Sequence, residues 1–320
     1  MPFIPSSKTW GFLALAVILL SVSLTLLLVI KPPGKQPPEI SQFDPGALHT
    51  VTVENSDELL EIFASLNYIW PPETAIPRIA VETLPRDLAL LKTHRRKSVF
   101  LRILLPLVLA DNARILAQRE LLAAAFSSGV TTSDSKLLDE ISELAKTYKV
   151  EGNINVKNTR QALLRRVDVI PHSLVLAQAA LESGWGTSRF AQEANNLFGV
   201  WTWNPKEGLP PRRKSKDASH FVRKYENLRA SVRSYLFNIN VGHAYRDLRR
   251  SRAAMREQNQ DIDVMQLAAE LESYSERGEQ YVEEVRIMIE YNRLALLTHA
   301  ELAPDDQSLA SVTNHGWLNQ

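Results

Sequence analysis

The sequence predicts a mainly α-helical protein with a small β-hairpin lobe, preceded by one N-terminal transmembrane helix. Three observations support this prediction. An uncharged apolar run covers residues 10–30, apolar residues recur at helical spacing over most of residues 47–303, and one β-prone interval lies between residues 199 and 225. At 320 residues, 45% of them hydrophobic and 23% charged, the chain can also bury a large core without disulfides.

The transmembrane helix is predicted over residues 10–30, WGFLALAVILLSVSLTLLLVI, after a short tail of residues 1–9. A helix needs about 20 such residues to cross a bilayer. A cleaved signal peptide is the alternative, but its apolar run is shorter. Cleavage after the small-residue site Ser21-Val22-Ser23 would leave LTLLLVI exposed at the new terminus, so we favour an uncleaved anchor. Lysines flank both ends of the run, so charge does not orient it.

Residues 31–48 form a Pro-rich linker, in which paired prolines favour an extended spacer. We expect a helical N-terminal region, 49–150, packed on a second domain, 151–303, and a polar, flexible tail over residues 304–320.

The apolar run at residues 97–120 is interrupted by Arg102, Pro106 and Asp111, so it fits a buried core helix better than a second membrane span. Pro106 is expected to kink or divide that helix. Between Gly199 and Tyr225, VWTW is β-prone, residues 205–216 are typical of a loop, and residues 220–225 partly alternate, which predicts a hairpin. Further helices are predicted at residues 135–148, 158–167, 173–183, 227–239, 243–258, 264–274 and 279–291.

Composition excludes several kinds of chemistry. Lysine and arginine number 37 against 36 acidic residues, so the chain lacks the overall positive charge of a dedicated nucleic-acid binder. With no cysteine, there is no disulfide, thiolate metal site or cysteine nucleophile. The seven histidines form no H-E-x-x-H pair, and no P-loop, G-x-S-x-G elbow or dinucleotide fingerprint is present. We therefore expect no metal, no cofactor and no nucleic-acid partner, and the sequence is silent on oligomeric state.

Glu182 is the residue whose position suggests chemistry. Ser173 is predicted to cap the start of a helix and Gly184 to end it, which places Glu182 in the last turn. The carbonyl end of the helix and burial against Trp185 and Phe190 both disfavour a carboxylate. Both effects raise the pKa of Glu182 from ~4.3 toward the ~6–7 that suits a general acid. A glutamate at a helix end is most often simply solvated, so this spacing alone does not establish catalysis.

The flanking residues suit an extended, ring-containing ligand in the groove between the helical body and the lobe. Trp185, Phe198, Trp201 and Trp203 offer flat apolar faces. Aromatic residues at helical spacing usually belong to the core, so Trp201 and Trp203, on the loop and lobe, are the better candidates for binding.

This stretch strongly resembles the bacterial glucosaminidase family of peptidoglycan hydrolases, and its Bax-type branch in particular, over roughly residues 84–302. The family signature is A-x-E-S-x-W-G-x-S at a helix end, followed by N-N-L-F-G. The matching residues are Ala180, Glu182, Ser183, Trp185, Gly186 and Ser188, then Asn196, Leu197, Phe198 and Gly199.

The resemblance implies a lysozyme-like helical domain with a β lobe, in which residues 151–303 form the catalytic domain. It implies Glu182 as catalytic acid, Tyr245 as a tyrosine of the groove, and Asn196, Phe198 and Gly199 as glycan-contacting residues. The family also presents a second carboxylate from the β lobe.

Here Glu207 and Asp217 are the candidates for that second carboxylate, and we slightly favour Asp217 because it directly precedes the returning strand. The expected activity is that of an endo-β-N-acetylglucosaminidase acting on peptidoglycan glycan strands. A muramidase, a lytic transglycosylase or a non-catalytic wall-binding tether are alternatives. The retaining, inverting and substrate-assisted routes all stay open. Such a substrate places the catalytic domain outside the cytoplasmic (inner) membrane of a bacterium, facing the periplasm or cell wall.

Overall fold

A computed structural model describes residues 44–128, 135–211 and 220–304. The predicted tail 1–9, the predicted membrane span 10–30, most of the linker and nearly all of the predicted tail 304–320 lie outside these residues. Within the described part of the chain, no helix combines the length and the apolar character that a membrane crossing requires.

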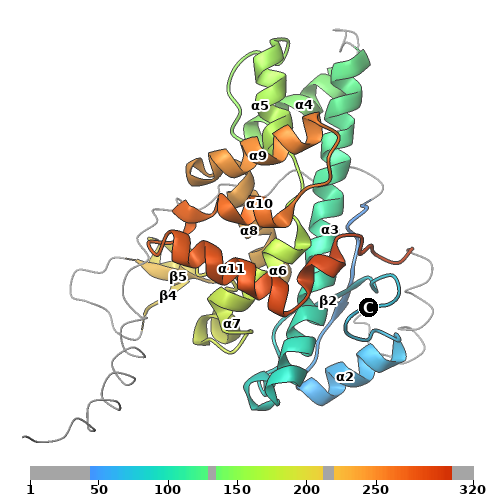
Figure 1. The fold of residues 1–320 in the computed structure, drawn as a ribbon, viewed down its shortest axis with the longest axis vertical. Coiled ribbons are helices and arrows are strands. Elements are labelled where there is room, and N and C mark those ends of the chain that lie inside the picture. The colour runs from blue at the N-terminus through green and yellow to red at the C-terminus, as the bar shows by residue number, and fades with distance from the viewer. Residues whose placement is uncertain (1–43, 129–134, 212–219, 305–320) are drawn as a thin grey trace, which may run out of the picture.

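The described residues form a mainly helical body, as predicted, with two small sheets (Figure 1). The α-helices are α2 (Ser56–Ser65), α3 (Thr93–Ser128), α4 (Ser135–Thr147), α5 (Lys157–Arg166), α6 (His172–Ser183), α7 (Arg189–Ala194), α8 (Leu228–Val241), α9 (Arg246–Glu257), α10 (Val264–Ala269) and α11 (Glu279–Tyr291). The 3-10 turns are η1 (Leu88–Leu90), η2 (Pro205–Glu207), η3 (His243–Tyr245), η4 (Glu272–Tyr274) and η5 (Leu294–Leu297). The strands are β1 (His49–Val51), β2 (Ile79–Val81), β3 (Trp201–Thr202), β4 (Gly208–Leu209) and β5 (Phe221–Arg223).

Helix α3 is the central helix of the body and runs along its long axis (Figure 1). Its residues from 99 to 112 are all buried, and it packs against α6 and α8, so the prediction of a core helix is confirmed. Of the two predicted effects of Pro106, a kink or a division, the structure excludes division, because α3 continues through the proline. A proline inside a helix costs about 3 kcal/mol, which the burial of several large apolar side chains offsets.

The β lobe is a three-stranded antiparallel sheet in the order β3-β5-β4, rather than the predicted two-stranded hairpin. The added strand, β4, lies in the stretch predicted as loop. It pairs Gly208 with Arg223. A Cβ at Gly208 would lie 2.5 Å from the Cβ of Phe221, so the strand depends on a close approach that only glycine permits.

The N-terminal region is not purely helical, because β1 and β2 pair in parallel, His49 with Ile79. Strands of three residues are too short to leave an alternating pattern in the sequence. Residues 44–48, the end of the predicted linker, lie against the body. The Asp44 carboxylate is 2.9 Å from Arg114 Nε, and Arg78 donates to the carbonyls of Pro45 and Ala303.

One hydrophobic core runs from Val51 to Leu297 and crosses the predicted boundary at residue 150. Helix α3 of the N-terminal region contributes to it together with α6 and α8. The division into domains at that boundary stays a prediction.

Candidate active site

Helix α6 carries Glu182 and ends as predicted. Gly184 adopts the left-handed conformation with φ 58° and ψ 46°, and the Trp185 amide donates to the Ala180 carbonyl at 2.9 Å. Gly186 follows with φ +77°, where a Cβ would lie 2.9 Å from the ring of Phe100. The E-S-x-W-G spacing therefore produces a tight turn packed onto α3.

The start of α6 differs from the prediction. Ser173 is not the N-cap but the second residue of the helix, and Pro171 occupies the cap position without a side-chain hydrogen bond. The Pro171 carbonyl accepts from the Leu174 amide at 3.0 Å instead. The Pro171 carbonyl also accepts from the Val175 amide at 3.2 Å, so the helical hydrogen bonds begin one residue earlier than predicted.

Glu182 lies in the last turn of α6, half-buried. Burial raises the pKa of its carboxyl, which Glu284 raises further, whereas a hydrogen bond from Tyr281 and the charge of Arg277 partly lower it. Arg277 is itself paired with Glu284 at 2.6 Å, and no arginine or lysine among the described residues forms a salt bridge with Glu182. The carboxyl is thus biased toward its protonated form, as a general acid requires.

Four buried tyrosines lie near Glu182, and one of them, Tyr281, donates a hydrogen bond to its carboxyl. Burial is the main reason that their pKa values are raised, and the negative charge of Glu182 raises each of them further. Three of the rings lie against one another: the Tyr274 centroid lies 5.1 Å from Tyr281 and 6.1 Å from Tyr245. The cluster consists of Tyr235 from α8, Tyr245 from η3, Tyr274 from η4 and Tyr281 from α11.

Tyr245, predicted for the site, is therefore brought to Glu182. Its hydroxyl is buried and has no hydrogen bond of ordinary geometry to the described residues. The Asn238 side chain nevertheless lies close enough to favour its ionised form and to lower its pKa slightly against the effect of burial.

Gly199 borders the carboxyl: it has φ +67°, and a Cβ built there would lie 3.9 Å from Glu182 Oε2. Phe198 is buried and stacks on Tyr235 with centroids 4.1 Å apart. Asn196 is also buried, and its side-chain amide makes three hydrogen bonds. Nδ2 donates to the carbonyls of Val200 and Arg223 at 2.8 Å each, and Oδ1 accepts from the Val200 amide. In the free protein, Phe198 and Asn196 therefore join the lobe to the helical body.

The predicted tryptophans have different surroundings. Trp203 is 43% exposed on the lobe, and Trp201 stacks on His220 with centroids 3.9 Å apart. Trp185 is half-buried, with Phe100 against its ring and the Lys97 ammonium 4.5 Å from its centroid. The lobe thus presents the more accessible aromatic surface.

The structure does not decide which residue, Glu207 or Asp217, supplies the second carboxylate. Glu207 is exposed in η2, where Asn204 Nδ2 donates to its Oε1 at 2.9 Å, and Asp217 lies outside the described residues. No group of three or more histidine, aspartate or glutamate side chains within the described ranges is placed to hold a metal ion.

Sequence reasoning missed four residues around Glu182: Gln178, Tyr235, Tyr274 and Tyr281. Tyr235 falls in an apolar stripe that predicts core packing, and Tyr274 and Tyr281 lie in predicted helices. The available signal was Gln178, a polar residue within the otherwise apolar run SLVLAQAAL, because a buried amide requires hydrogen-bond partners.

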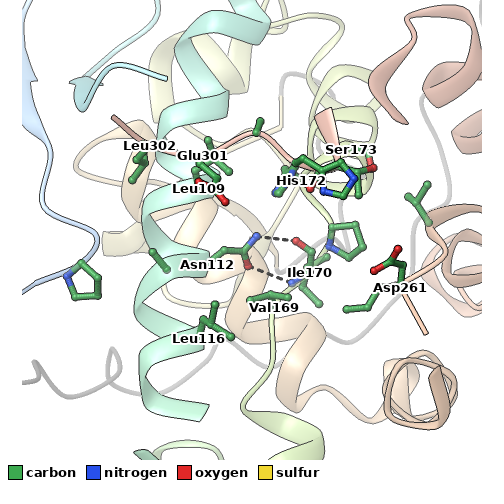
Figure 2. A pocket seen from close by; sticks show the side chains of 18 of the residues that line it. Leu109, Asn112, Leu116, Val169, Ile170, His172, Ser173, Asp261, Glu301 and Leu302 are labelled. Atoms are coloured by element: carbon green, nitrogen blue, oxygen red, sulfur yellow. Dashed lines mark hydrogen bonds between the residues drawn. The ribbon is translucent and has the colours of Figure 1, made fainter. Parts of the chain in front are cut away.

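A cavity of about 550 Å³ lies at the opposite end of α6 (Figure 2). His172 and Ser173 line it together with Leu109 and Leu116 of α3, and Asn112 exchanges two hydrogen bonds with the Ile170 backbone beside it. None of the predicted site residues that the structure describes lines this cavity. Ten residues of helix, roughly 15 Å, separate His172 from Glu182, so the cavity belongs to another part of the molecule.

Comparison with known proteins identifies the family. The glucosaminidase family model, described as mannosyl-glycoprotein endo-beta-N-acetylglucosaminidase, matches residues 157–294, which include Glu182 and the four tyrosines. Protein bax of Escherichia coli (strain K12) is 34% identical over 205 residues, covering 64% of this chain and 72% of bax. Exo-glucosaminidase LytG of Bacillus subtilis (strain 168) is 55% identical over 40 residues, 12% of this chain and 14% of LytG. No solved structure matches the chain. The chain therefore belongs to the glucosaminidase family of glycosidases, as a Bax-type member.

Proposed function

We propose that the protein is a membrane-anchored peptidoglycan hydrolase that cleaves glycan strands at N-acetylglucosamine, as an endo-β-N-acetylglucosaminidase. The observation that carries the proposal is the Glu182 carboxyl, held at the end of α6 with a raised pKa and without a salt bridge to an arginine or lysine among the described residues. The family membership restricts the chemistry to glycosidic bonds.

In this proposal, protonated Glu182 donates its proton to the glycosidic oxygen as the bond to the sugar breaks. Burial keeps the proton on the acid before the reaction. The Tyr281 hydrogen bond and the charge of Arg277 stabilise the carboxylate afterwards, because both favour the ionised form. The positive charge that develops on the sugar is met by a second carboxylate, Asp217 or Glu207, or by the N-acetyl group of the substrate.

Two further features support a glycan substrate. The Tyr245 hydroxyl lacks a well-formed protein partner among the described residues, so it is available to hold a buried water near Glu182. Trp201 and Trp203 on the lobe supply flat faces on which sugar rings stack. The predicted span at residues 10–30 and the linker after it would tether this site to the inner membrane, with the catalytic domain facing the periplasm or cell wall.

The test compares wild type with Glu182→Gln in the digestion of purified sacculi. Glutamine is nearly isosteric but has no carboxylic proton to donate, so release of soluble fragments is expected to stop while the circular dichroism spectrum is retained. Glu193→Gln is the matched control, since Glu193 is an exposed glutamate on α7 that pairs with Arg189. Activity retained in Glu182→Gln would refute the assignment of the acid.

Mass spectrometry of the fragments tests the bond that is cut. Reducing N-acetylglucosamine ends support the proposal, reducing muramic acid ends indicate a muramidase, and anhydro-muramic ends indicate a lytic transglycosylase. Binding to sacculi without fragment release, by wild type and Glu182→Gln alike, would indicate a tether. Deletion of residues 1–30 is expected to move the protein from the membrane fraction to the soluble fraction, and a full-length chain recovered as soluble would contradict the anchor.

A further inference from the structure

Gln178 is fully buried in α6, one turn before Glu182 and on the same side of the helix. Its amide joins two members of the tyrosine cluster. Nε2 donates to the Tyr281 hydroxyl oxygen at 2.9 Å, and Oε1 accepts from the Tyr235 hydroxyl. Both ends of the amide are therefore engaged.

These contacts give the chain of hydrogen bonds a direction. Because the Tyr281 oxygen receives the Gln178 N–H, the Tyr281 O–H points away from Gln178 and donates to Glu182. The order is Tyr235 to Gln178, Gln178 to Tyr281, and Tyr281 to Glu182. Each bond polarises the next, so the donation from Gln178 makes Tyr281 a stronger donor to the carboxylate.

We propose that Gln178 is a positioning residue that acts through Tyr281 to set the balance between the protonated and ionised forms of Glu182. The inference rests on the proposed role of Glu182 as the general acid. Gln178 itself touches no reacting atom. The other groups that influence the Glu182 charge come from α8, η3, η4, α11 and the turn before α11: Tyr235, Tyr245, Tyr274, Glu284 and Arg277.

The test is Gln178→Met, which keeps the volume of the side chain and removes both hydrogen bonds. Without the donation to its oxygen, Tyr281 stabilises the carboxylate less, so the pKa of Glu182 rises. A general acid is active when protonated, and the basic limb of the kcat/KM profile on sacculi therefore moves to higher pH, by roughly a few tenths of a pH unit. Tyr281→Phe removes the bond to Glu182 itself and is expected to move the limb further, by about one to two pH units.

Gln118→Met is the matched control. Gln118 is another buried glutamine that accepts from a tyrosine hydroxyl, Tyr148 at 2.8 Å, but in α3 and apart from the cluster. We expect it to lose stability without moving the basic limb. The proposal is wrong if the limb in Gln178→Met stays where it is in wild type or moves to lower pH.

A second measurement separates this proposal from the proposed function. Carboxyl carbon NMR of ¹³C-labelled glutamate follows the titration of Glu182 directly, assigned by its loss in Glu182→Gln. A higher titration midpoint in Gln178→Met supports the role of Gln178 even if sacculi are not the substrate, and an unchanged midpoint refutes it even if they are. If Gln178→Met does not fold, Tyr235→Phe removes the donor to Oε1 and is expected to raise the same midpoint, with an unchanged midpoint again refuting the proposal.

Discussion

Asp168 offers the sharpest test of how the site is held in place. It lies four residues before α6 and is 1% exposed. Arg256 binds its two carboxylate oxygens at 2.7 Å each, and Arg119 and Arg252 lie 3.5 and 3.6 Å away. One carboxylate therefore serves three guanidinium groups from α3 and α9, at the segment that leads into the helix carrying Glu182.

The predicted effect of Asp168→Asn is a large loss of stability. The variant leaves three arginines close together with no carboxylate between them, and Arg252 is wholly buried. Burial already lowers the pKa of Arg252 to about 10, which shows how poorly that position tolerates a charge. Removing one partner of a buried ion pair costs about 3–5 kcal/mol, which corresponds to a fall in Tm of roughly 10 °C for a body of this size.

The assay is urea and thermal unfolding of the variant beside Asp247→Asn. Asp247 forms an exposed pair with Arg250 at 3.0 Å, so its loss is expected to cost less than about 1 kcal/mol. A change in the free energy of unfolding below 1 kcal/mol for Asp168→Asn would refute the reasoning. It would mean that water or backbone carbonyls stabilise the charged arginines without the carboxylate.

Three further predictions concern the site itself. Gly199→Ala is expected to lower stability by about 1–2 kcal/mol and to reduce kcat, because alanine is strained at φ +67° beside Glu182; wild-type unfolding and turnover would contradict this. The pKa of Glu182 is raised above its ordinary value of 4.5, so the native state loses stability as pH rises upward from that value. Glu182→Gln is therefore expected to gain stability relative to wild type between pH 4 and 7 in thermal unfolding scans, and an equal difference at all pH values would contradict the shift. Asn196→Ala removes the side-chain partner of the Arg223 carbonyl and of the Val200 amide, whereas the Val200 carbonyl still accepts from the Arg223 amide. The expected cost is about 2–4 kcal/mol, and earlier proteolytic cleavage within the lobe is the expected signature; unaltered cleavage would argue against its role in joining the lobe.

Features that depend on a few neighbouring residues were predictable. Gly184 ends α6 because a left-handed residue there is favourable for glycine, and this places Glu182 in the last turn. The helix predicted at residues 279–291 has the same bounds in the structure. The N-cap prediction failed because the Pro171 carbonyl accepts the first helical hydrogen bonds, so the helix begins at His172, one residue before Ser173.

Features that depend on packing were not predictable. Pro106 is tolerated because α3 is covered on all sides over residues 99–112, and strand β4 depends on the close approach of Gly208 to Phe221 across the sheet. Neither contact is visible from the local pattern, since each partner lies outside the few residues that such a pattern covers.

The amino-acid sequence by itself determined the helical class, the family motif and the position of the acid at a helix end, because helix ends and apolar spacing are set over a few residues. Only the tertiary structure decided which side chains surround that acid. Tyr235, Tyr245, Tyr274 and Tyr281 come from four separate elements, and they come together near Glu182 because their rings are buried in one core.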